Sequence, residues 1–112
     1  MDTVKWLIVG NVLYGLFQFL TGFPLLRRKI GRNDFYGVRI KATLESDQRW
    51  YDVNAYAGRQ IVLWSMIPAA NGLAGFLVPH EASNAYLVES LILAPVAMVV
   101  PTVLALRWSR GH

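Results

Sequence analysis

Three long stretches without a charged residue dominate this 112-residue sequence, at residues 6–26, 61–78 and 90–106. A helix rises ~1.5 Å per residue and the hydrocarbon core of a bilayer is roughly 30 Å thick, so about 17–20 apolar residues are enough to cross it. A soluble chain of this length has too little other material to cover three such helices. The sequence therefore predicts a single three-span membrane domain over residues 1–112, with spans at about 5–26, 56–78 and 86–107.

The charged residues lie outside these stretches, and most Lys and Arg residues fall in the connection at 27–59. The second connection, at 79–85, contains no Lys or Arg, whereas the C-terminal tail contains Arg107 and Arg110. Because positively charged connections stay on the cytoplasmic side, we expect the N-terminus outside and both the 27–59 loop and the C-terminus inside. The absence of cysteine excludes disulfides and cysteine-based metal or redox sites.

Small and polar residues recur at helical spacing within each predicted span. They are Asn11, Gly15, Gln18 and Gly22 in the first span, Gly58, Ser65, Ala69 and Gly72 in the second, and Ser90, Ala94, Ala97, Pro101 and Ala105 in the third. In a bilayer, close backbone approach and interhelical hydrogen bonds decide which helix faces meet. We therefore expect an all-α fold, an integral membrane three-helix bundle, with one face left over for association into a homo-oligomer.

Few strongly polar or ionisable groups fall near the centre of the spans. Asn11, Gln18 and Asn71 are the candidate intramembrane polar residues, and Glu89 is the carboxylate closest to membrane depth. Such groups are the usual markers of a transport path. Glu89 lies near the start of its span, where it can reach water or headgroups at small cost, so an interfacial position competes with a role in proton coupling.

The long connection is expected to contain a turn and then the start of a helix. Residues 33–37 have the composition of a turn, and Thr43 or Ser46 would cap the helix that follows. From Trp50 onwards, residues of the kinds usually found in protein interiors recur on one helical face. We expect this helix to run along the membrane interface and to continue into the second span without a break.

Arg39, Asp47, Trp50 and Asn54 form a polar cluster in this loop. A desolvated arginine at a membrane interface normally needs a carboxylate partner, so we expect Arg39 to pair with Asp47 or Asp52. Trp50 would anchor the helix at headgroup level. We favour a salt-bridged clamp that orients the first two spans, and a ligand-binding site is the alternative.

The same loop resembles the motif of the SdpI family of bacterial membrane proteins. That motif has an Asn shortly before a Gly-Ile/Val-Arg-Thr-Pro-x-Thr-Leu segment. An acidic pair follows, then a Trp, then a His or an Asn, and finally Ala/Gly-Gly. The matching residues are Asn33, Gly37, Val38, Arg39, Thr43, Leu44, Asp47, Trp50, Asn54, Ala57 and Gly58. The sequence departs from the motif at Ile40 and Lys41, where Thr-Pro is usual.

The resemblance implies a location in the bacterial cytoplasmic membrane and a role in immunity. The best-known member protects its producer from a secreted toxin that attacks the membrane, and is also described as a sensor that holds a repressor at the membrane. The partners implied here are the lipid bilayer, a secreted peptide toxin outside, and a cytoplasmic regulator or an anionic lipid at the basic loop.

Two classes of function stay open at this point. One is a non-enzymatic immunity or sensing protein. The other is a small oligomeric transporter whose path would be lined by Glu89, Asn11, Gln18 and Asn71. No nucleophile, base and orienting residue lie together by spacing, so we expect no enzyme activity and no catalytic residue. We likewise expect no cofactor, no metal site and no nucleic-acid partner.

Overall fold

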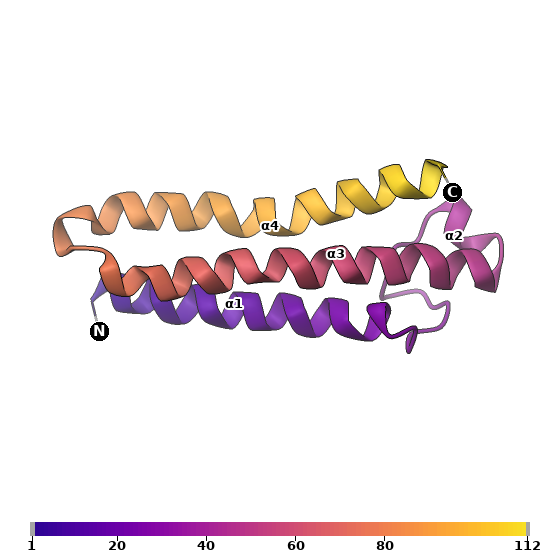
Figure 1. The fold of residues 1–112 in the computed structure, drawn as a ribbon, viewed down its shortest axis with the longest axis horizontal. Helices are drawn as coiled ribbons and strands as arrows, with labels where there is room; N and C mark the ends of the chain where they lie inside the picture. The colour runs from indigo at the N-terminus through magenta and orange to yellow at the C-terminus, as the bar shows by residue number, and fades with distance from the viewer. Residues whose placement is uncertain (1, 112) are drawn as a thin grey trace.

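The computed structural model describes residues 2–111. Its long helices are α1 (Thr3–Leu26), α3 (Asp47–Ala74) and α4 (Ser83–Gly111). The one-turn helix α2 (Lys41–Leu44) lies in the long loop, and the turn between α3 and α4 contains the 3₁₀ helices η1 (Gly75–Leu77) and η2 (His80–Ala82). Figure 1 shows the long helices side by side, with the N-terminus and the α3–α4 turn at one end and the C-terminus and the long loop at the other. The predicted all-α three-helix bundle is confirmed, and no strand occurs within residues 2–111.

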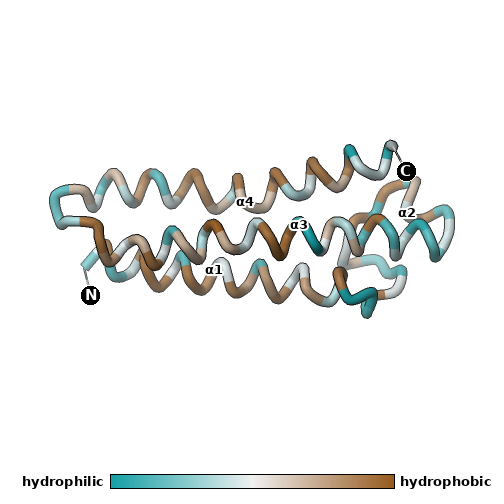
Figure 2. Tube along the Cα trace, viewed as in Figure 1, coloured by the Kyte–Doolittle hydropathy of each residue, from teal (hydrophilic) through white to brown (hydrophobic). Residues whose placement is uncertain are grey.

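The three long helices are long and apolar enough to cross a membrane. Figure 2 shows hydrophobic residues along their middle parts and hydrophilic residues in the long loop and near the chain ends. Large apolar side chains point outward, with Phe17 62% and Leu91 66% exposed, whereas Gln18 and Ser65 are buried in the interior. This arrangement suits a lipid surrounding, in which apolar side chains gain nothing by leaving the surface.

The small residues of the first two spans set the spacing between α1 and α3. Asn11, Gly15, Gln18 and Gly22 are all buried, as the helical spacing predicted. A Cβ added to Gly15 would lie 3.0 Å from the Ala69 nitrogen, and one added to Gly58 would lie 2.5 Å from the Gly22 oxygen. Since no side chain fits at such distances, these glycines allow the two backbones to approach closely.

Helix α3 joins the long loop to the second span. Ser46 caps it, because its side-chain oxygen accepts a hydrogen bond from the Arg49 N–H at 3.1 Å. The helix enters the span without a break, as expected, but it follows the long axis of the bundle from its first turn (Figure 1). The expectation that this first part would lie along the membrane interface is therefore corrected: buried Trp50 and Asn54 pack inside the protein instead.

Candidate functional site

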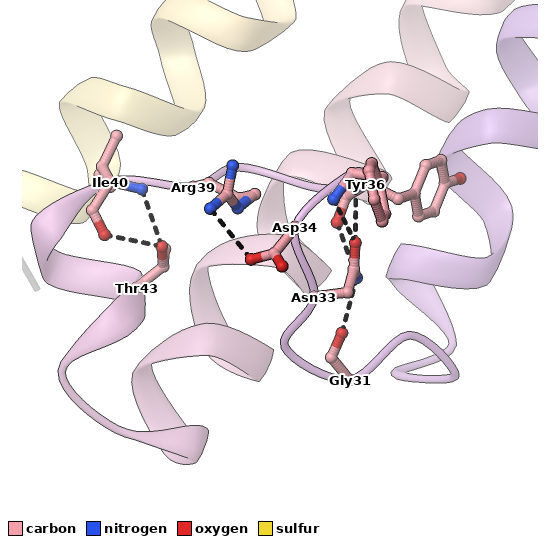
Figure 3. A network of polar contacts seen from close by, with 8 residues as sticks. Gly31, Asn33, Asp34, Tyr36, Arg39, Ile40 and Thr43 are labelled. Carbon is pink, nitrogen blue, oxygen red and sulfur yellow. Dashed lines mark hydrogen bonds and ion pairs between the residues drawn. The ribbon is translucent and has the colours of Figure 1, made fainter.

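The motif loop begins with a tight turn that the Asn33 side chain holds (Figure 3). Its Oδ1 accepts hydrogen bonds from the N–H groups of Phe35 at 2.8 Å and Tyr36 at 2.6 Å, and its Nδ2 donates to the Gly31 and Tyr36 oxygens. Asparagine suits this place because its short amide replaces backbone partners in a turn. The Tyr36 hydroxyl donates to the Thr21 oxygen of α1. Burial raises the pKa of Tyr36, which keeps this hydroxyl a donor and the turn fixed to the first span.

Asn54 of α3 holds the chain directly after this turn. Its Oδ1 accepts from the Val38 N–H at 2.6 Å, and its Nδ2 donates to the Trp50 oxygen at 3.0 Å and lies 3.3 Å from the Val38 oxygen. Gly37 has a φ of +106°, which residues with a side chain rarely adopt. A Cβ there would also lie 2.8 Å from the Asn54 Oδ1, so glycine is needed for conformation and for space.

Thr43 of α2 holds the same segment from the other side. The hydroxyl of this buried residue accepts from the Ile40 N–H at 3.0 Å, a contact drawn in Figure 3. It also lies 2.9 Å from the Val38 oxygen and 3.0 Å from the Ile40 oxygen, and its single proton can go to either. The backbone N–H and oxygen of Val38 are thus bonded by side chains from two helices.

Trp50 connects this segment to the end of the first span. Its ring is fully buried and donates the Nε1–H to the Ile30 oxygen at 2.8 Å. Gly58, two turns further along α3, lies directly against the backbone of α1. We call the structure formed by Asn33, Gly37, Thr43, Trp50 and Asn54 the motif clamp.

The ion pairs of the loop differ from the prediction. The observed pairs are Arg39–Asp34 at 3.5 Å, Arg32–Asp47 at 3.0 Å and Arg28–Asp52 at 3.1 Å. The expected pairing of Arg39 with Asp47 or Asp52 is wrong, because Arg32 and Arg28 occupy those carboxylates. Exposed ion pairs contribute about 0–1 kcal/mol. Neutral hydrogen bonds, most of them partly buried, therefore hold the motif clamp, and salt bridges do not.

Arg39 lies beside a groove between the loop, α1 and α4. The groove has a volume of about 440 Å³ and is lined mainly by apolar side chains, among them Leu25, Met98 and Leu106. The Arg39 side chain is 39% exposed and its ion pair with Asp34 is long. Among the motif residues, Arg39 is thus an exposed cation that the clamp does not need.

Two of the predicted intramembrane polar residues, Asn11 and Asn71, join the helices. Asn11 Nδ2 donates to the Ser90 Oγ at 3.0 Å, and Asn71 Nδ2 lies 3.3 Å from both the Asn11 Oδ1 and the Ser90 Oγ. The Tyr86 hydroxyl donates to the Asn71 oxygen at 2.9 Å. These groups bond to one another across α1, α3 and α4, which is a packing arrangement.

Gln18 compensates for a proline in α4. Pro101 has no N–H, so it cannot bond to the Ala97 oxygen four residues earlier. The buried Gln18 donates its Nε2–H to that oxygen at 2.8 Å and to the Ile61 oxygen of α3 at 3.1 Å. Within residues 2–111, the Gln18 Oε1 has no hydrogen-bond partner. One amide thus links all three long helices.

Within the described residues, the Glu89 side chain makes no hydrogen bond with these polar groups. It is exposed on an outward face of α4, in a shallow hollow that α4 forms alone, with Val88, Ile92 and Val96 beside it. The structure therefore does not bring Glu89 together with the other predicted intramembrane polar residues.

The clamp and the spans around it match a known protein family. The SdpI/YfhL protein family matches residues 29–108. The chain belongs to this family. The match takes in the whole motif clamp together with α3 and most of α4. Neither the curated proteins nor the solved structures yield a match.

Tyr36 and Arg28 are two structurally important residues that sequence reasoning did not single out as site residues. Tyr36 bonds to a backbone oxygen of α1, and backbone acceptors give no signal in a sequence. Arg28 has a φ of +59°, a conformation in which glycine is the usual residue. An arginine at this position therefore gave no sign in the sequence that the helix ends here in a left-handed residue.

Proposed function

We propose that this chain is a non-enzymatic immunity or sensing protein of the bacterial cytoplasmic membrane, which protects its producer from a secreted membrane-active toxin. The match of the SdpI/YfhL family to residues 29–108 is the observation that carries this proposal. The resemblance of the motif loop to a family in which toxin immunity occurs supports the same role. The fold alone would not, because one fold hosts many functions.

In this proposal the basic end of the bundle faces the cytoplasm and the α3–α4 turn faces outside, in keeping with the distribution of Lys and Arg. The outer turn presents two large apolar side chains, Phe76 at 74% and Leu77 at 86% exposure. Exposed apolar side chains at such an end suit contact with an amphipathic peptide at the membrane surface. We assign the encounter with the toxin to this end, and contact with a cytoplasmic regulator or an anionic lipid to the basic loop.

The arrangement of the polar groups favours immunity over a small oligomeric transporter. A proton-coupled path needs a titratable group that alternates between the two sides of the membrane. Glu89, the candidate for that role, is exposed on an outward face of α4. Asn11, Asn71 and Ser90 are engaged with one another between the helices, which supports a packing role for them.

The experiment compares cells of a sensitive bacterial strain with and without the chain, challenged with a panel of secreted membrane-active peptides. We expect the lethal dose of at least one peptide to rise severalfold, and the Glu89→Gln variant to protect equally well. In parallel, proteoliposomes containing a pH-sensitive dye report proton flux. The immunity proposal would be contradicted if cells with the chain stayed as sensitive to every peptide as cells without it. A proton flux that Glu89→Gln abolishes would also contradict it.

A further inference from the structure

A second face of α3, which takes no part in the motif clamp, forms a basic pocket with the ends of α1 and α4. Arg49, Asp52, Tyr56 and Arg59 follow one another on this face at helical spacing. They line a pocket of about 650 Å³ together with Arg28, which follows the end of α1, and Trp108 of α4. We call these six residues the arginine pocket.

The arginine pocket contains more positive than negative charge. Its three guanidinium groups face one carboxylate, that of Asp52, which pairs with Arg28 at 3.1 Å. Arg49 donates an Nη2–H to the Ser109 oxygen at 2.9 Å, which places its guanidinium against the end of α4 without neutralising it. Within residues 2–111, the Arg59 guanidinium has no hydrogen bond or ion pair. Two positive charges are therefore available to an anion.

Arg28 occupies a backbone conformation that usually belongs to glycine. α1 ends in a Schellman motif, in which the Lys29 N–H bonds to the Pro24 oxygen at 3.0 Å and the Arg28 N–H to the Leu25 oxygen at 3.1 Å. The motif puts Arg28 at a φ of +59°, which is unfavourable for a residue with a Cβ. The end of the helix does not explain an arginine here, whereas a role for its side chain in the pocket does.

The aromatic residues of the pocket mark the level of the lipid headgroups. The rings of Tyr56 and Trp108 stack with centroids 4.7 Å apart and an interplanar angle of 7°. Tyr and Trp concentrate where a membrane span meets the headgroups. Arg59 is the last charged residue before the apolar stretch at 61–78, so it lies at the same boundary. The positive charges are thus near the depth at which lipid phosphates occur.

We propose that the arginine pocket binds the phosphodiester headgroup of an anionic phospholipid. Guanidinium groups form paired hydrogen bonds with phosphate oxygens, and they are weakly hydrated enough to do so at an interface. Leu26 and Ala55 add apolar surface to the pocket beside the spans, where acyl chains lie. The site lies outside the motif clamp, within the basic loop. It rests on the contact with an anionic lipid proposed above for that loop and names the residues that would hold the headgroup.

The test uses the full chain purified in detergent and dioleoylphosphatidylglycerol as the added probe, with binding followed by native mass spectrometry. We expect saturable binding that becomes about tenfold weaker in Arg59→Gln, because a hydrogen bond to a charged group is lost. Arg110→Gln is the matched control: it removes the same charge from an exposed arginine outside the pocket and should bind lipid as the unaltered chain does. Arg28→Gly should also bind weakly while its melting temperature does not fall, because glycine suits the left-handed conformation.

Three results would overturn the proposal. Equal losses of lipid affinity in Arg59→Gln and Arg110→Gln would mean that the net charge of the protein, and not the pocket, determines binding. Equal binding of dioleoylphosphatidylcholine would contradict recognition of an anionic headgroup. Displacement of the lipid by millimolar inorganic phosphate would identify a free anion, and not a lipid, as the ligand. Because none of these measurements involves a toxin, their outcome is independent of the survival assay.

Discussion

The substitution Asn54→Ala tests the motif clamp most sharply. Asn54 is 2% exposed, and its Oδ1 is the partner of the Val38 N–H at 2.6 Å. In the variant, the Thr43 hydroxyl is still within reach of the Val38 oxygen and the Trp50 oxygen stays within α3, whereas the Val38 N–H loses its partner. An unsatisfied buried donor costs about 1–3 kcal/mol, and this donor is partly buried, so we expect the free energy of unfolding to fall by about 1 kcal/mol.

Two measurements in detergent follow this variant. Thermal unfolding by circular dichroism gives the loss of stability, and hydrogen exchange reports whether the amides of residues 36–43 lose protection while those at the centre of α1 keep it. Asn84→Ala is the matched control, since Asn84 is exposed and its side chain makes no hydrogen bond within the described residues. Equal melting temperatures for the two variants, with unchanged exchange at 36–43, would refute the clamp.

The remaining predictions concern other contacts. Gly37→Ala should destabilise the protein by at least 1 kcal/mol, because the positive φ disfavours a Cβ; a melting temperature like that of the unaltered chain would count against the +106° turn. Arg39→Ala should change the free energy of unfolding by about 1 kcal/mol or less, because the ion pair of Arg39 is exposed. A much larger fall in the free energy of unfolding would contradict this. Gln18→Leu should lower the free energy of unfolding by roughly 1 kcal/mol in the unaltered chain. The loss should be smaller in the Pro101→Ala background, because that substitution restores a helical partner for the Ala97 oxygen. Strictly additive effects in the double-mutant cycle would refute the link between Gln18 and Pro101.

The sequence predicted those parts of the fold that depend on length and periodicity. The apolar runs predicted the three long helices, and the small-residue spacing predicted the buried face of α1, because no bulky side chain fits where Gly15 and Gly58 lie. Ser46 was predicted as one of two caps, since few residue types can bond to the free N–H groups at a helix start. These features are local or repeat at a fixed period.

The sequence could not predict which loop residues meet. Several arginines and carboxylates lie within a few residues of one another, and exposed pairs among them differ by less than about 1 kcal/mol, so the pattern did not distinguish Arg32 from Arg39 as the partner of Asp47. The folded loop brings Arg32 to Asp47 and leaves Arg39 beside Asp34. The motif named the residues of the clamp, but their hydrogen bonds to the Val38 peptide appear only once the loop is folded.

The orientation of the bundle underlies the whole account, because it assigns the toxin to the α3–α4 turn and the regulator to the loop. The chain has no cysteine, so single cysteines can be introduced without background at Glu81 in that turn and at Glu45 in the long loop, both of which are exposed carboxylates. An impermeant thiol reagent should label Glu81→Cys in intact cells, and should label Glu45→Cys only after the cells are broken. Labelling of Glu45→Cys but not Glu81→Cys in intact cells would contradict the account.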